Sequence, residues 1–141
     1  YGEDKDLFPT LPALPLSSYV TVDYEVHGCP MTQKEFLQLL TSILAGKKPV
    51  KPDYAVCVEC KLDENECVYG KGMICMGPIT RAGCDALCPS FGQYCIGCRG
   101  LVPHPNKEAM INILIENGLS IDDAEKRMDL YNSNEKDVVL I

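Results

Sequence analysis

The first periodicity along the chain is an alternation of apolar and polar residues over residues 18–26. The apolar positions are Val20, Val22, Tyr24 and Val26. A period of two residues is typical of a strand that buries one face and leaves the other in water. The alternation therefore predicts a β-strand that leads into the turn Gly28-Cys29-Pro30.

The pattern changes to helical spacing after this turn. Thr32 and Glu35 have the spacing of a capping box, and Gly46 suits the C-terminal cap of the same helix. The apolar positions in between are Phe36, Leu37, Leu40, Ile43 and Leu44. This unit places Cys29 at the helix entrance, where backbone N–H groups favour a thiolate. Taken alone, Cys29 fits a buried structural thiol equally well.

Two further helices are predicted near the C-terminus. Asn106 can cap a helix that runs to Asn117, with Gly118 as its stop. Apolar residues cover more than half of the circumference of this helix. They are Met110, Ile111, Ile113, Leu114 and Ile115. Ser120 begins the second helix. The inner stripe of that helix is predicted to be Ile121, Ala124, Met128 and Tyr131.

Apolar residues also occur where no regular element is predicted. Residues 1–17 carry Pro at every third position from Pro9 to Pro15, with leucines between them. A free linker needs no leucines, so we expect this arm to lie on another surface, the alternative being a mobile Pro-rich tail. Residues 138–141 are all apolar and are predicted to dock on a partner, the alternative being an apolar terminus that arose by chance.

The composition narrows the class of protein. The chain has 141 residues, of which 46% are hydrophobic and only 7% aromatic, so a small aliphatic core is expected. The formal charge of −7 argues against a nucleic-acid partner, because binding of phosphates needs a basic face. No apolar run approaches the length that spans a bilayer, and the N-terminus does not resemble a signal peptide.

The nine cysteines change the picture most. They are Cys29, Cys57, Cys60, Cys67, Cys75, Cys84, Cys88, Cys95 and Cys98. A disulfide framework needs an oxidising compartment and fits an odd number poorly. Two zinc sites would use eight cysteines, but the paired C-x2-C spacing is only partly met. Two cubane iron–sulfur clusters also need eight thiolates, and the spacing favours them. Seven glycines between residues 57 and 100 would let the loops wrap closely around such a core.

In order, the motifs Gly28-Cys29-Pro30, Cys57-Val58-Glu59-Cys60, Cys75-Met76-Gly77-Pro78, Cys88-Pro89 and Cys95-Ile96-Gly97-Cys98 form a specific set. This set resembles the small, electron-transfer subunit of cytoplasmic nickel–iron hydrogenases, of the sulfhydrogenase delta-subunit type. That family is related to the 20 kDa subunit of NADH:quinone oxidoreductase. The resemblance implies a subunit of a hydrogenase, an oxidoreductase acting on hydrogen, with no complete active site and no catalytic residue in this chain.

The resemblance also implies which cysteines hold which cluster. The distal 4Fe–4S cluster would use Cys57, Cys60, Cys67 and Cys75, and the medial cluster Cys84, Cys88, Cys95 and Cys98. In a swapped alternative, Cys88 completes the other cluster, as in two-cluster ferredoxins. Cys29 would share a third, proximal 4Fe–4S cluster. The early C-x-x-C and most of the flavodoxin-like half that complete that cluster are absent here, so a separate N-terminal portion is one expected partner.

The other expected partners are the nickel–iron large subunit and a flavin- or iron–sulfur-containing diaphorase subunit. The chain would pass electrons between hydrogen chemistry and a flavin/NAD(P)- or ferredoxin-linked partner. Two alternatives remain, a non-redox zinc-binding interaction module and a 20 kDa-type subunit of a respiratory complex. No Gly-x-Gly-x-x-Gly nucleotide motif is present.

The expected fold is α+β, with irregular loops around two clusters, a strand–turn–helix remnant of a flavodoxin-like half and two C-terminal helices. Its parts are residues 1–50, 51–104 and 105–141. Basic residues that could offset cluster charge are Lys61, Lys71, Arg81 and Arg99. Of these, Lys71 is expected at the surface, and Arg81 and Arg99 in packing or hydrogen bonding within the subunit. His27 and His104 are expected to be structural or exposed rather than functional.

Overall fold

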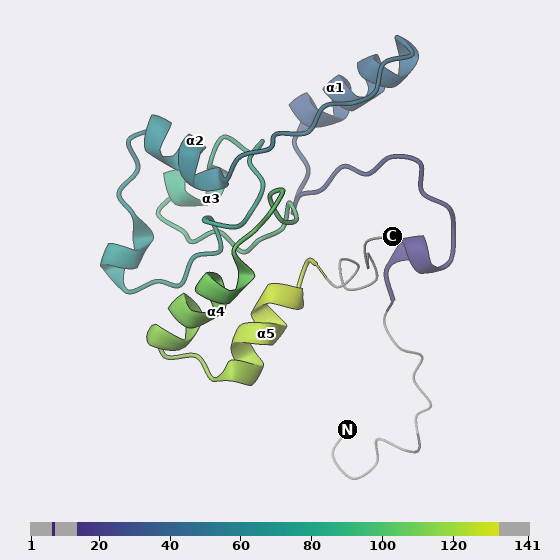
Figure 1. The fold of residues 1–141 in the computed structure, drawn as a ribbon. Coiled ribbons are helices and arrows are strands. Elements are labelled where there is room, and N and C mark those ends of the chain that lie inside the picture. The colour runs from purple at the N-terminus through teal and green to yellow at the C-terminus, as the bar shows by residue number, and fades with distance from the viewer. Residues whose placement is uncertain (1–6, 8–13, 133–141) are drawn as a thin grey trace.

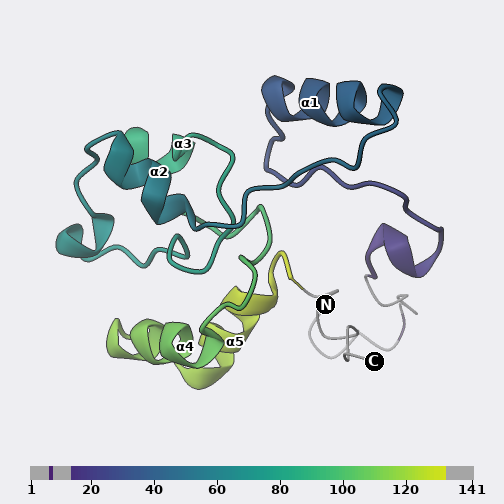
Figure 2. The same cartoon turned by 45° about the horizontal axis from the view of Figure 1, so that its top comes forward.

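The computed structural model describes residue 7 and residues 14–132, and within them it is built from short helices and irregular loops (Figures 1 and 2). The helices in chain order are η2 (Leu16–Ser18), α1 (Gln33–Leu44), α2 (Val56–Leu62), η3 (Val68–Lys71), α3 (Leu87–Ser90), α4 (Lys107–Glu116) and α5 (Ile121–Asp129), where η denotes a 3₁₀-helix. Two isolated antiparallel bridges join Ala55 to Arg81 and Thr80 to Leu101. They tie the two ends of the cysteine loops together.

The strand predicted over residues 18–26 is wrong. The segment follows the short helix η2 as irregular chain, and Val20 and Tyr24 are each 50% exposed. A strand needs a neighbouring strand whose backbone groups pair with its own, and the described residues contain none. The alternation therefore reflects a tendency that this part of the chain cannot satisfy. The described part is α-helical and irregular, without the β component of the expected α+β fold.

Helix α1 begins and ends where the sequence predicted. Thr32 is its N-cap, and the reciprocal hydrogen bonds of the capping box with Glu35 are both present. Gly46, with a φ of 65°, lies in the left-handed region just after the helix. The helix stands away from the other helices in both views (Figures 1 and 2). Its apolar side chains Phe36, Leu37, Leu40, Ile43 and Leu44 are all exposed.

The core lies between the cysteine loops and helices α4 and α5, which pack against each other (Figure 1). Its buried members from the cysteine region are Val56 of α2, Val68 of η3 and the loop residues Met76, Ile79, Ala86 and Leu101. Those from the helices are Met110, Leu114, Ala124 and Met128. None of the buried residues is aromatic, so the expectation of an aliphatic core is confirmed for the described residues.

The predicted caps of the C-terminal helices are confirmed. The Asn106 side chain accepts a hydrogen bond from the Ala109 N–H, and the Ser120 hydroxyl accepts one from the Asp123 N–H. Three positions of the predicted apolar faces are wrong, because Ile115, Ile121 and Tyr131 are exposed. A helix of nine residues packed on one neighbour buries only the narrow stripe that faces that neighbour.

Other predictions from the sequence concern the chain ends. Leu14 and Leu16, at the end of the Pro-rich arm, are exposed. The rest of that arm and residues 138–141 lie outside the described residues. No helix in the described ranges is long and apolar enough to cross a bilayer.

Candidate cluster-binding site

The first four cysteines of the loop region converge. Helix α2 carries Cys57 and Cys60, Cys67 precedes η3, and Cys75 follows it. Burial raises the pKa of the Cys57 thiol to about 11, and the charges of Cys75, Cys60 and Cys67 act in the same direction. Burial, Cys75 and Cys67 likewise raise the pKa of Cys60. The neighbouring sulfurs thus disfavour ionisation of Cys57 and Cys60, and a bound metal core would remove this penalty because it takes thiolates as ligands.

Gly77 leaves a hollow between two of these sulfurs. A Cβ atom at position 77 would stand 3.2 Å from Cys57 Sγ and 3.3 Å from Cys75 Sγ, closer than ordinary contact. Backbone N–H groups also point at Cys75 Sγ, from Gly77 at 3.4 Å and from Cys95 at 3.3 Å. N–H donors to ligand sulfur are typical of iron–sulfur sites, so the residues present fit a cluster at this place.

The second set is more spread out. The charges of Cys98 and Cys84 add to burial in raising the pKa of Cys88. Cys95 is only 6% exposed, and burial raises its pKa to about 12 although hydrogen bonds with Gly97 and Thr80 oppose the shift. The charges that act on it come from Cys75 of the first set and Cys98 of the second. Cys95 therefore lies between the two sets.

Cys29 is exposed and lies beside the second set rather than apart from both. Burial raises the pKa of Cys98, while a hydrogen bond from the Cys29 backbone lowers it and the charge of the Cys29 thiol raises it. The Gly28-Cys29-Pro30 turn is thus held next to Cys98. The sequence did not anticipate this closeness, because about seventy residues separate the two positions.

The cysteines do not gather around a single point. Within residues 14–132, no three side chains of His, Cys, Asp or Glu come together in a geometry that would hold one metal ion. The four thiolates of a cubane bind four different iron atoms, so they surround a volume instead.

The arginines have the structural roles expected of them. Arg99 is 4% exposed and forms an ion pair with Glu35 of α1. Burial alone would lower the pKa of Arg99, but the hydrogen bond and charge of Glu35 outweigh it, so that pKa is raised. The Arg81 guanidinium donates a hydrogen bond of 2.9 Å to the Leu101 carbonyl. These contacts fasten α1 and the loop ends to the cysteine region.

The remaining charged candidates lie at the surface or at its edge. Lys61 and His104 are exposed, and Lys71 forms a surface ion pair with Glu66. His27 contacts Glu25, and its pKa is lowered, mainly by burial. These positions agree with the structural or surface roles that the sequence suggested for Lys71 and the histidines.

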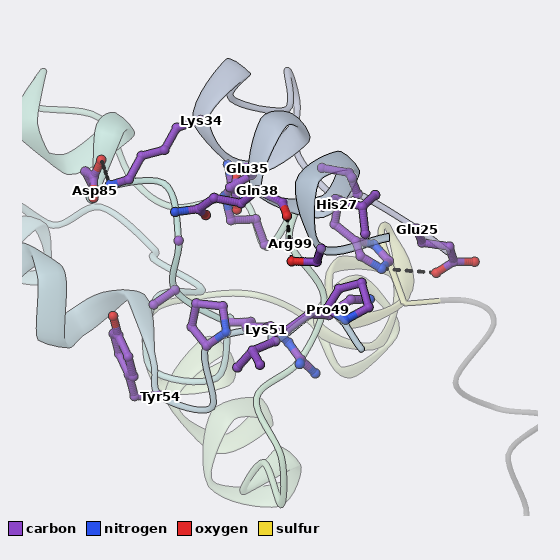
Figure 3. A pocket seen from close by; sticks show the side chains of 18 of the residues that line it. Glu25, His27, Lys34, Glu35, Gln38, Pro49, Lys51, Tyr54, Asp85 and Arg99 are labelled. Carbon is purple, nitrogen blue, oxygen red and sulfur yellow. Dashed lines mark hydrogen bonds and ion pairs between the residues drawn. The ribbon is translucent and has the colours of Figure 1, made fainter. Parts of the chain in front are cut away.

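A cavity of about 480 Å³ separates α1 from the cysteine loops (Figure 3). Figure 3 shows Glu35 and Arg99 on one side and Lys51 and Tyr54 on the other. Ion pairs in its walls join Glu35 to Arg99 and Lys34 to Asp85, the latter at 3.5 Å. The lining also includes the buried carboxylate of Glu59.

Two residues near the cysteines were missed in the sequence. The Tyr69 hydroxyl donates a hydrogen bond to the Cys75 carbonyl. Burial raises the pKa of Tyr69 to about 12. Glu59, between Cys57 and Cys60, is only 8% exposed and contacts the loop that carries Cys84. The only sequence signal for Glu59 is an acidic residue inside a C-x2-C pair, which by itself does not distinguish a buried carboxylate from a surface one.

Comparison with known proteins finds relatives among hydrogenase subunits. No family model matches the chain. The chain is 46% identical over 117 residues to the delta subunit of sulfhydrogenase 2 from Pyrococcus furiosus, a match that covers 82% of the chain and 49% of that relative. The chain is similar to hydrogenase subunits. Such proteins are oxidoreductases that act on hydrogen.

Two further relatives carry related names, both from F420-non-reducing hydrogenases. The vhu-type relative from Methanocaldococcus jannaschii is 35% identical over 104 residues, 61% of the chain and 36% of the relative. The iron-sulfur subunit from Archaeoglobus profundus is 29% identical over 117 residues, 63% of the chain and 36% of the relative. The chain thus spans between about a third and a half of the length of these relatives.

Proposed function

We propose that the chain is the two-cluster, electron-transfer part of a hydrogenase small subunit. Cys57, Cys60, Cys67 and Cys75 hold one 4Fe–4S cluster, and Cys84, Cys88, Cys95 and Cys98 hold the other. The observation that carries the proposal is the closeness of the first four cysteines to one another, with the sulfurs of Cys57 and Cys75 flanking Gly77. The name of the Archaeoglobus relative, an iron-sulfur subunit, supports the same cofactor.

The chain's own residues would do two things for such clusters. The aliphatic core around Val56, Met76 and Leu101 keeps water from one side of the sulfurs. Backbone N–H groups aimed at Cys75 Sγ stabilise the negative charge on that sulfur. When bound, the clusters supply carriers for single electrons. Cys95 is buried and lies beside Cys75 of the first set, so it would stand between the two clusters.

The partners belong to the same proposal. Cys29 alone cannot hold a cluster, so a third cluster would need ligands from outside this chain. A nickel–iron large subunit and a flavin- or iron–sulfur-containing partner would stand at the two ends of the electron path, in the cytoplasm. The exposed apolar stripe of α1 supports an assembly, because a stripe of that size is normally covered. The relation to the 20 kDa respiratory subunit is part of the resemblance.

Anaerobic purification with iron and sulfide analysis tests the cofactor. About eight irons per chain are expected, together with a broad brown absorbance that bleaches on reduction. A value near four would mean that one of the two cysteine sets is not a ligand set. A colourless protein loaded with zinc would overturn the electron-transfer function, because zinc has no redox chemistry. Reduction of the clusters by hydrogen in the assembled complex would distinguish a hydrogenase from a respiratory subunit.

A further inference from the structure

Glu59 is a buried carboxylate that accepts hydrogen bonds from the backbone of a neighbouring loop. It points from α2, the helix that carries Cys57 and Cys60, toward the loop of residues 83–86. Its Oε1 accepts a hydrogen bond of 2.7 Å from the Gly83 N–H, and its Oε2 accepts one of 3.1 Å from the Ala86 N–H. A buried carboxylate is costly unless such donors satisfy it, and hydrogen bonds to a charged group are the stronger kind.

The loop that Glu59 holds has a backbone that few sequences adopt. Gly83 has a φ of 120°, and the residues Asp85 and Ala86 farther along the loop have φ values of 53° and 47°. Non-glycine residues in this region cost of order 1–3 kcal/mol each and persist only where their surroundings enforce them. Two N–H groups converging on one carboxylate form an anion-binding concavity, which provides that enforcement.

The same loop delivers a cysteine. Cys84 Sγ lies 3.9 Å from Glu59 Oε2, and Ala86 is the N-cap of α3, which carries Cys88. Glu59 therefore connects the helix that presents two sulfurs of the first set to the loop that presents two of the second. In the described part of the chain, no basic side chain forms an ion pair with Glu59. The Arg99 guanidinium also interacts electrostatically with Cys84, so the carboxylate and the guanidinium act on this sulfur with opposite sign.

We propose that Glu59 is a positioning residue that holds the Cys84 loop in place, and that its negative charge lowers the reduction potential of the cluster bound by the second cysteine set. This inference rests on the proposed function. A negative charge close to a ligand sulfur disfavours the addition of an electron, since reduction makes the cluster more negative. Glutamine keeps the length of the side chain but removes its charge and one of its two acceptor oxygens, whereas aspartate keeps the charge and both oxygens but shortens the side chain.

The test uses the hydrogenase complex purified anaerobically with four versions of this chain. They are the wild type, Glu59→Gln, Glu59→Asp and the control Glu66→Gln. Glu66 also sits beside a cysteine, Cys67, but its carboxylate is exposed and paired with Lys71 at 2.9 Å. The readouts are iron per chain and the midpoint potentials of the two clusters, followed by electron paramagnetic resonance during a redox titration.

Glu59→Gln is expected to raise the midpoint potential of the cluster bound by the second cysteine set. The potential of the first cluster should stay nearly unchanged. Glu59→Asp should raise the potential of the second cluster less, because the charge remains, but should lose iron from the second set, because the shorter side chain does not reach both N–H groups. Glu66→Gln should leave both potentials and the iron content at wild-type values.

Potentials in Glu59→Gln equal to those of the wild type would overturn the charge effect. Equal upward shifts in Glu59→Gln and Glu59→Asp would also overturn it, because only one of them removes the charge. Full iron content in Glu59→Asp would overturn the positioning role. A wild-type complex in which this chain holds no iron–sulfur cluster would instead overturn the proposed function itself, and the inference with it.

Discussion

The small space at Gly77 predicts a substitution whose effect should fall first on the first cluster. In Gly77→Ala, one added methyl group would stand 3.2 Å from Cys57 Sγ and 3.3 Å from Cys75 Sγ. The backbone at this position does not require glycine, because its φ is not positive. The cost of the change is therefore steric and falls on two sulfurs that must also keep their bonds to iron.

The size of the effect follows from the contact distances. Both contacts are a few tenths of an ångström too short, and overpacking of this kind costs about 1–3 kcal/mol. If that cost is felt only when the cluster is bound, the first cluster should be held about 5- to 150-fold more weakly. Cys75 has little room to move, because its sulfur already accepts hydrogen bonds from the Gly77 and Cys95 N–H groups.

Loss of iron to a chelator under anaerobic conditions measures this effect. Gly77→Ala should release its iron faster than the wild type, with about half of it, from the first cluster, leaving ahead of the rest. Gly70→Ala is the matched control, since an added Cβ there meets nothing within 4 Å and the position also needs no positive φ. The reasoning is refuted if Gly77→Ala and Gly70→Ala release iron with the same time course.

Three further predictions concern other parts of the molecule. Cys29→Ser should leave both clusters of the eight-cysteine region intact by iron analysis and paramagnetic resonance, while slowing electron exchange with the large subunit; loss of either signal would contradict a separate role for Cys29. Arg99→Ala should lower the free energy of unfolding by about 3 kcal/mol, because it leaves Glu35 without its buried partner. Lys71→Ala removes a surface pair and should lower it by less than about 1 kcal/mol. Equal losses of both variants in chemical denaturation would contradict this. Residues 1–141 expressed alone should aggregate through the exposed stripe of α1, and co-expression with a hydrogenase large subunit should restore a defined species on anaerobic size exclusion; a well-behaved monomer would contradict the assembly.

The features that the sequence predicted correctly are local. The capping box at Thr32 and the caps at Asn106 and Ser120 depend on hydrogen bonds across three residues, so their signals lie within one turn of helix. The helix α2, which brings Cys57 and Cys60 together, was not predicted.

The features that it missed depend on distant segments. The alternation over residues 18–26 forms a strand only beside another strand, and the described chain provides none. Glu59 becomes a buried anchor because Gly83 and Ala86, more than twenty residues away, turn their N–H groups toward it. In the same way, Cys29 meets Cys98 through the fold and not through its spacing. Single-sequence patterns carry no information on which distant backbone will arrive at a given side chain.

The contact between Cys75 and Cys95 bears on how such a protein would mature. The Cys95 N–H donates to Cys75 Sγ at 3.3 Å, and the Met76 N–H donates to the Cys95 carbonyl at 2.9 Å. Under the proposed function, insertion of the first cluster fixes Cys75 and, through these two bonds, also fixes the backbone of a ligand of the second. The second insertion then has less chain entropy left to remove. Cluster loading should therefore be cooperative during biogenesis, with few half-loaded chains at intermediate iron supply.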